Sequence, residues 1–203
     1  MNQQGKTQTE GEMSLAEMRA RVIEAASGVY ERKGREASVE EIAAAAGLSV
    51  PVTYQFVKKP ADIMLLILED LQRRFADLAK TDLEGPADPQ AKLMAVVDKY
   101  YRVVDQERSK VMLLYRASRQ LDPEGRKRVM VLEMEAVAIF RRILEEGLAQ
   151  GVFHLTDPDL TAYDILMMGH TWALKSWHFK RRGMSLENFV QAQQDLVLAL
   201  VRG

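Results

Sequence analysis

The sequence predicts an all-α protein of about nine helices, and three observations favour that class. Apolar residues recur every three or four positions along most of the chain, which is the period of an amphipathic helix. No segment shows the period-two alternation that is typical of a half-buried strand. Three Asp-Pro pairs each combine a helix-capping aspartate with a proline at the first helical position, where a missing N–H does no harm.

The first helix is expected to begin after Ser14, which can cap it, and to end at Gly34. The polar segment before it, residues 1–13, lacks an apolar signal core, and we predict that it is a disordered tail.

Residues 38–59 predict two short helices that are joined by a tight turn. Ser38 and Glu41 have the spacing of a capping box, and Gly47 can end the first short helix in a left-handed conformation. Ser49 can cap the second short helix, with Pro51 in its first turn. This pattern is typical of a helix-turn-helix, a unit that places its second helix in the major groove of DNA. We expect that second helix to span Val50 to Val57.

The remainder of the chain predicts six further helices. Turn residues between positions 81 and 89 separate the first of them from the others. The expected ranges are 60–80, 89 onward, 107–119, 158–182 and 186–201, together with a helix that begins at Pro123 and whose end is marked by Gly147 and Gly151. We place a DNA-binding domain at 14–60 and a helical ligand-binding and dimerisation domain at 61–203.

The helix expected at 158–182 has two apolar stripes, and the last helix has one. A helix that is apolar on two faces must bury both of them. Either one face meets a second copy of the chain in a two-fold dimer, or both faces are buried within one monomer.

Composition excludes several classes of protein. The chain has no cysteine, which excludes disulfides and thiolate chemistry and is natural for a cytoplasmic protein. Its longest aliphatic run is far below the ~20 residues that span a membrane, so we expect no membrane partner. The formal net charge is −1, so any DNA-facing positive surface must come from the placement of a few cations.

Catalysis is not expected. His170 and His178 are too far apart for a helical metal pair, and the sequence has neither a glycine-rich phosphate loop nor an elbow-type serine. We therefore predict no catalytic residue, no metal site and no cofactor.

Order and spacing of these residues resemble the tetracycline-repressor (TetR) family of bacterial transcriptional regulators. The resemblance covers roughly residues 15–65: a first helix ending in an aromatic residue and Gly34, then EIAAAAGLS, a segment centred on Tyr54, and a lysine-bearing step into the next helix. The segment GLAQGVF is similar to a further recurrent feature of that family. The chain departs from the family pattern at Pro51, Val52 and Pro60, where glycine, threonine and lysine are common, which leaves the operator sequence open.

The resemblance implies an all-helical homodimer. Three N-terminal helices would bind double-stranded operator DNA, and about six more would form a ligand-binding core. A ligand would move the two DNA-reading heads apart and release the operator, as in a repressor.

Nine residues are candidate DNA contacts. We expect phosphate contacts from Ser38, Ser49, Tyr54, Lys58 and Lys59, and base-edge contacts from Val50, Pro51, Val52 and Gln55. Pro51 and Val52 can meet thymine methyl groups, and Gln55 can bond adenine. The alternatives are a core aromatic at Tyr54, a simple helix cap at Ser49, and solvated lysines. We expect Ile42, Ala45, Leu48 and Phe56 to pack between the helices.

The candidate ligand contacts are mainly aromatic residues and methionines, and methionine adapts to irregular apolar shapes. They are Tyr100, Met112, Tyr115, Arg119, Met167, His170, Trp172 and Trp177. Four cations between Lys175 and Arg182 lie close to two tryptophans, so a small hydrophobic ligand could be an acyl-CoA ester. The alternatives are another apolar molecule, or a basic helix end with no ligand.

Two other classes remain open. One is a helical protein-interaction module that retains the helix-turn-helix only as a scaffold. The other is a small-molecule enzyme, which would keep its activity after replacement of Tyr54 and Gln55, whereas a repressor would lose DNA binding.

Overall fold

The computed structural model describes residues 13–33, 37–83, 88–117 and 121–202. These residues contain ten helices and no strand, which confirms the all-α class. The expected disordered tail, apart from Met13, lies outside the described residues, and so does the expected helix end at Gly34.

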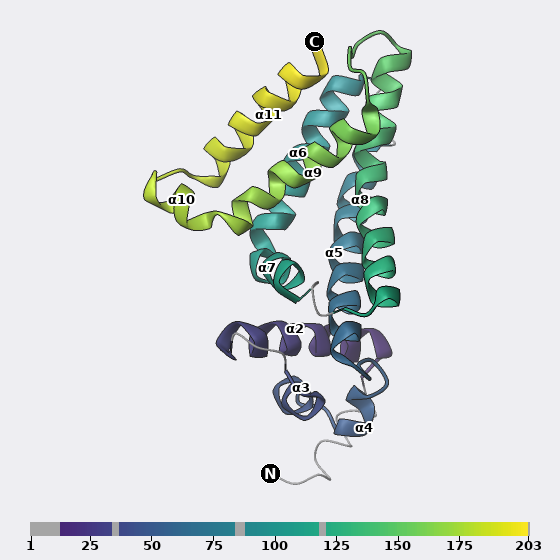
Figure 1. The fold of residues 1–203 in the computed structure, drawn as a ribbon, viewed down its shortest axis with the longest axis vertical. Coiled ribbons are helices and arrows are strands. Elements are labelled where there is room, and N and C mark those ends of the chain that lie inside the picture. The colour runs from purple at the N-terminus through teal and green to yellow at the C-terminus, as the bar shows by residue number, and fades with distance from the viewer. Residues whose placement is uncertain (1–12, 34–36, 84–87, 118–120, 203) are drawn as a thin grey trace. The chain divides into compact units, whose positions relative to one another are not determined.

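Figure 1 shows the helices in chain order. They are α2 (Leu15–Lys33), α3 (Val39–Ala46), α4 (Val50–Thr53), α5 (Pro60–Leu83), α6 (Pro89–Gln106), α7 (Arg108–Ala117), α8 (Pro123–Ala149), α9 (Pro158–Leu174), α10 (Ser176–Arg181) and α11 (Leu186–Arg202).

The chain divides into two compact units. The first comprises the described residues up to Leu68 together with Leu113–Arg128, and the second comprises Glu69–Met112 and Val129–Gly203. The helices α5, α7 and α8 each contain residues of both units. Our domain boundary at residue 60 stays a prediction.

Packing in the first unit joins α2 to α3 and α3 to α4. Val22 of α2, Ile42 of α3 and Leu48 of the turn are all buried. Phe56 is half-buried, but Ala45 is exposed, so the expected packing role of Ala45 is wrong. In the helical register of α3, its neighbours Ala43 and Ala46 face the core instead.

Packing in the second unit places α6 against α9 and α11. Tyr101 of α6 is fully buried, and its hydroxyl donates a hydrogen bond of 3.0 Å to the Ile165 carbonyl of α9. Glycine is required at position 169, because a Cβ there would lie 2.5 Å from Cε1 of Tyr101. The two helices therefore cross closely at this point.

Helix starts follow the capping residues that the sequence indicates. The Asp88 and Asp157 side chains accept hydrogen bonds from backbone N–H groups in the first turns of α6 and α9. Asp122 accepts one from Gly125 of α8 at 2.7 Å, and Ser185 accepts one from Asn188 of α11 at 3.1 Å.

The single helix expected at 158–182 is wrong, because the chain breaks it at Lys175 into α9 and α10. In one straight helix, Trp172 and Phe179 would be about two turns, roughly 10 Å, apart. The bend instead brings their ring centroids to 5.2 Å, and both rings pack on Phe189 of α11. The break allows these three aromatic rings to pack together, and it leaves Trp177 64% exposed.

Candidate DNA interface and ligand core

The helix-turn-helix has the local geometry that its capping residues predict. Ser38 Oγ accepts from the Glu41 N–H at 3.2 Å, and the Glu41 carboxylate accepts from the Ser38 N–H at 3.0 Å. Gly47 has φ 69°, and its N–H donates to the carbonyls of Ala43 and Ala44 at the end of α3. An L side chain at this φ would be strained. The turn therefore fixes the direction in which α4 leaves α3.

The regular helix α4 ends at Thr53, so it is shorter than the helix from Val50 to Val57 that the sequence predicts. Backbone bonds from Tyr54 to Val50 and from Val57 to Thr53, both 3.0 Å, continue as turns. Thr53 is buried, and its hydroxyl donates to the Ser49 carbonyl at 3.0 Å. Ser49 occupies the N-cap position, but its hydroxyl makes no capping hydrogen bond.

Three of the predicted DNA contacts on this segment point to solvent. Pro51 and Gln55 are exposed, and Tyr54 is 44% exposed, so Tyr54 is not a buried core aromatic. Val50 and Val52 are half-buried. The buried Thr53 and Val57 anchor the segment from beneath, which leaves a small outward surface of one ring, one amide and one proline.

The two predicted phosphate-binding lysines follow this segment, and both are exposed. Their backbone N–H groups donate to Asp62 at 2.8 and 3.0 Å, so Asp62 caps the start of α5. The Lys59 ammonium also donates to Asp122 at 2.8 Å. That hydrogen bond raises the pKa of Lys59 and lowers the pKa of Asp122. The sequence did not indicate this pair, because the partners are 63 positions apart.

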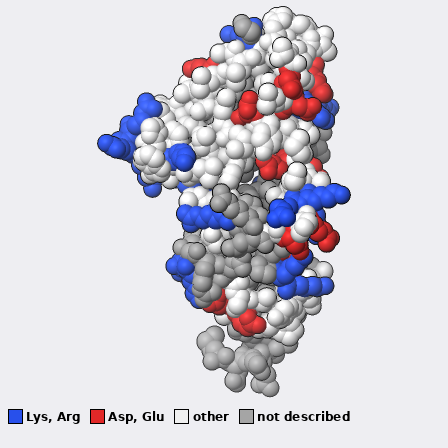
Figure 2. All heavy atoms as spheres, viewed as in Figure 1, with Lys and Arg blue, Asp and Glu red and all other residues white. Residues whose placement is uncertain are grey.

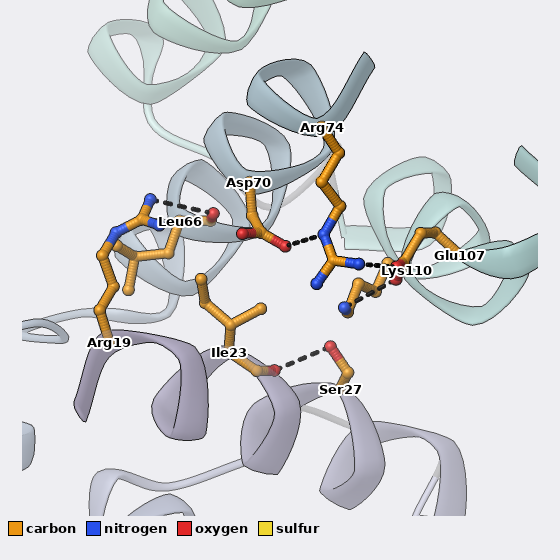
Figure 3. A network of polar contacts seen from close by, with 8 residues as sticks. All are labelled: Arg19, Ile23, Ser27, Leu66, Asp70, Arg74, Glu107 and Lys110. Carbon is orange, nitrogen blue, oxygen red and sulfur yellow. Dashed lines mark hydrogen bonds and ion pairs between the residues drawn. The ribbon is translucent and has the colours of Figure 1, made fainter. Parts of the chain in front are cut away.

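Further polar contacts tie helices together within each unit (Figure 3). In the first unit, Arg19 of α2 donates to the Leu66 carbonyl of α5 at 3.4 Å. In the second, Arg74 of α5 pairs with Asp70 at 3.1 Å and with Glu107 at 2.7 Å. Lys110, which is 5% exposed, pairs with the same Glu107 at 2.7 Å. The corner between α6 and α7 is thus held to α5.

Two predicted ligand residues meet in the second unit. The Tyr100 hydroxyl and His170 Nε2 are 2.6 Å apart, and the Tyr100 ring contacts Phe75 and Phe140. Burial lowers the pKa of His170 to about 4, so its imidazole is neutral at pH 7. The pair places a neutral donor and acceptor among aromatic rings, which suits an uncharged polar atom of a largely apolar molecule.

A second polar contact holds Trp172. Its indole N–H donates to Asp105 at 2.6 Å, Asp105 also pairs with Arg108 at 2.5 Å, and the Arg108 guanidinium lies 5.4 Å from the Trp172 ring centroid. Sequence reasoning missed Asp105 and Arg108, although a three-residue separation of opposite charges at a helix corner is a recognisable pattern.

The other predicted ligand residues differ in exposure. Met112 and Met167 are half-buried, Tyr115 is 37% exposed and belongs to the first unit, and Trp177 is exposed on α10. Arg119 lies outside the described residues. Ligand contact by all eight residues stays a prediction.

Neither a metal cluster nor a spanning segment occurs in the part of the chain that the structure describes. No three His, Asp or Glu side chains there are grouped to hold a metal ion. None of the described helices is long and apolar enough to cross a membrane.

Comparison with known proteins gives consistent matches. Residues 86–201 match the family of tetracyclin repressor-like C-terminal domains. The chain is 27% identical over 178 residues to the HTH-type transcriptional regulator HbdR of Aromatoleum sp. (strain CIB), covering 87% of this chain and 77% of that protein.

Solved structures also match over nearly the whole chain. The TetR family transcriptional regulator PfmR from Thermus thermophilus is 26% identical with a TM-score of 0.72, covering 88% of this chain and 97% of its own. FadR from Bacillus subtilis, in complex with stearoyl-CoA, is 20% identical with a TM-score of 0.75, covering 90% and 99%. The second likeness concerns the fold alone.

Proposed function

Because the chain belongs to the tetracycline repressor-like family of transcriptional regulators, and is not an enzyme, we propose that it is a homodimeric, cytoplasmic repressor of a pseudo-palindromic operator. A small hydrophobic molecule would release it. The observation that supports DNA binding most directly is the solvent exposure of Pro51, Tyr54 and Gln55. These residues follow α3, which is capped at both ends.

In each copy of the homodimer, α4 and the turn that follows it, residues 50–55, would lie in the major groove of one half-site. Gln55 would bond adenine and Pro51 would contact thymine methyl groups, whereas Tyr54, Lys58 and Lys59 would contact phosphates. The half-buried Val50 and Val52 have less surface to offer. Ser38 and Ser49 stand at helix starts, where N–H groups favour a phosphate.

Dimerisation would use α9 and α11. Each presents large apolar side chains to solvent in the single chain: Leu160 and Tyr163 on α9, and Leu196 and Leu200 on α11. The opposite sides of both helices are buried, with Ile165 and Val197 fully so. A two-fold pair would cover these exposed residues on both copies at once.

The ligand would enter the core of the second unit, and an acyl-CoA ester is our preferred candidate. Support comes from FadR of Bacillus subtilis, a protein of similar fold whose structure was solved in complex with stearoyl-CoA. Tyr100 and His170 would bond the thioester carbonyl. Another hydrophobic acid or alcohol is the alternative.

Fluorescence anisotropy with DNA from upstream of the gene tests DNA reading. Tyr54→Phe and Gln55→Ala should each weaken binding to the specific sequence, and Gln55→Ala should also relax discrimination at one base pair by about 1–3 kcal/mol. Ala44→Ser, an exposed change on α3, is the control and should bind normally. Binding without sequence preference at every salt concentration would favour the alternative, a helical interaction module with a scaffold helix-turn-helix.

Isothermal titration of stearoyl-CoA with and without operator tests induction. Linkage requires operator DNA to weaken ligand binding by the factor by which ligand weakens DNA binding. Equal ligand affinities in both titrations would refute induction and leave DNA binding intact. An alternative acid that binds where stearoyl-CoA does not would refute only the ester.

A further inference from the structure

The short helix α10 and the residues around it form an exposed cationic corner with a tryptophan at its centre. Trp177 is 64% exposed, and four cations within eight positions are exposed with it, which Figure 2 shows as a concentration of blue around α10. The four cations are Lys175, Lys180, Arg181 and Arg182, and none of them forms an ion pair with a described residue. We call these five residues the α10 knob.

A second unpartnered surface lies on α8. Met130, Val131 and Met134 are 66%, 53% and 45% exposed, and Glu133 and Glu135 lie beside them on the same helix. An exposed cluster of large apolar residues with a charged border is the usual composition of a protein interaction site. We call these five residues the α8 pad.

The start of α9 adjoins the α8 pad. The Tyr163 hydroxyl donates to Glu133 at 2.8 Å, and Arg141 of α8 pairs with Asp159 at 3.1 Å. Tyr163 is 37% exposed and Leu160 is 58% exposed, so they extend the apolar surface of the pad onto α9. The neighbouring Asp164, also exposed, adds a third carboxylate.

The knob cannot reach the pad of its own chain. The knob follows the end of α9, whereas the pad adjoins its start, and α9 has 17 residues. Tyr163, which contacts the pad, lies 11 residues before Leu174 at the end of α9, and at 1.5 Å per residue these two positions are about 17 Å apart. A second copy that is reversed along α9 brings its own knob to this start, and a two-fold axis forms the contact twice.

We propose that the α10 knob of one copy docks on the α8 pad of a second copy, with Trp177 seated between Met130 and Met134. Methionine side chains adapt to an aromatic ring, and their sulfur contacts with rings are favourable. Opposite charge at the border, four cations against Glu133, Glu135 and Asp164, fixes the orientation. The inference rests on the proposed homodimer and adds a contact between α10 and α8 that adjoins its α9 face.

Engineered disulfides test the contact directly, because the chain has no native cysteine. Trp177→Cys combined with Met130→Cys or with Met134→Cys should yield a covalent dimer under mild oxidation on a non-reducing gel, since a disulfide needs Cα atoms within about 7 Å. Each single variant should yield little. Trp177→Cys with Val152→Cys is the matched control, because Val152 is also apolar and 38% exposed but lies outside the pad.

A charge exchange provides the second measurement. Arg181→Glu should weaken dimerisation several-fold in sedimentation equilibrium, and adding Glu135→Lys to it should restore most of the affinity. Covalent linkage in the control pair equal to that in the pad pairs, or no linkage in either pad pair, would overturn the proposal.

Sedimentation of the unmodified protein separates this failure from the failure of the proposed function. A dimer without pad linkage would refute the knob contact alone, whereas a monomer at all concentrations would refute the homodimer too. Binding of the protein to phosphatidylglycerol vesicles that is lost in Trp177→Ala, without pad linkage, would assign the knob to a lipid surface and overturn the proposal.

Discussion

Gly147→Ala in α8 should destabilise the protein, although alanine is the better helix former. Gly147 is buried beneath Phe153, a ring that is 2% exposed. A Cβ at position 147 would lie 2.0 Å from Cδ2 and 2.3 Å from Cε2 of that ring. Ordinary contact begins at 3.4 Å, so the ring or the helix must move by about 1.4 Å.

The magnitude follows from two opposing terms. Overpacking of a buried site costs about 3 kcal/mol at the upper end of its usual range, and replacing glycine by alanine in a helix recovers about 1 kcal/mol. The free energy of unfolding should therefore fall by about 2 kcal/mol. For a chain of this length, that corresponds to a decrease in Tm of about 4–8 °C.

Thermal unfolding followed by circular dichroism at 222 nm measures this decrease. All variants need the same protein concentration, because the proposed dimerisation would make Tm depend on it. Gly28→Ala in α2 is the matched control: a Cβ there meets only the end of the Arg32 side chain, at 3.4 Å. Gly28→Ala should raise stability by up to about 1 kcal/mol. An unchanged or raised Tm for Gly147→Ala would refute the argument from ring packing.

Three further perturbations test particular contacts. Asp122→Asn keeps a good helix cap but removes the charge that pairs with Lys59, so affinity for DNA of any sequence should rise. Lys59→Gln should lower the salt slope of DNA binding by about 0.9. Weaker binding by Asp122→Asn in an anisotropy titration would mean that Asp122 positions Lys59 instead. Burial holds the pKa of folded His170 at about 4, below its unfolded value near 6.5, so protonation in acid favours the unfolded chain. The free energy of unfolding should therefore decrease as pH falls from 6.5 to 4, by up to about 1.4 kcal/mol per pH unit. Urea titrations of His170→Gln should lack this decrease. Trp172→Phe leaves a carboxylate of Asp105 without its indole donor and should cost about 1–3 kcal/mol in the same urea assay, and a change below the error of the assay would contradict it.

The start of several predicted helices could be read from sequence, because its cause is local. Asp88, Asp157 and Ser185 bond N–H groups only two or three residues ahead, so the capping side chain and the helix are visible together. The break at Lys175 could not be read. Neither glycine nor proline marks it, and its cause is the packing of Trp172 and Phe179 on a ring in α11.

The candidate sites were predictable to different degrees, because local causes can be read from sequence and tertiary contacts cannot. The outward positions of Pro51, Tyr54 and Gln55 follow from a capped turn and a short helix. The ligand residues depended on tertiary contacts, and such a contact joins Tyr100 to His170. Periodicity gives the face on which a side chain lies but not its partner on another helix.

The composition of the first unit has a practical consequence for anyone who wishes to build hybrid regulators from this chain. The unit that contains the helix-turn-helix is not one continuous stretch, since Leu113–Arg128 belong to it together with the described residues up to Leu68. A graft cut after position 68 would leave Lys59 without Asp122. Exchanges of DNA specificity should therefore transplant both stretches, or alter only the outward side chains between positions 50 and 55.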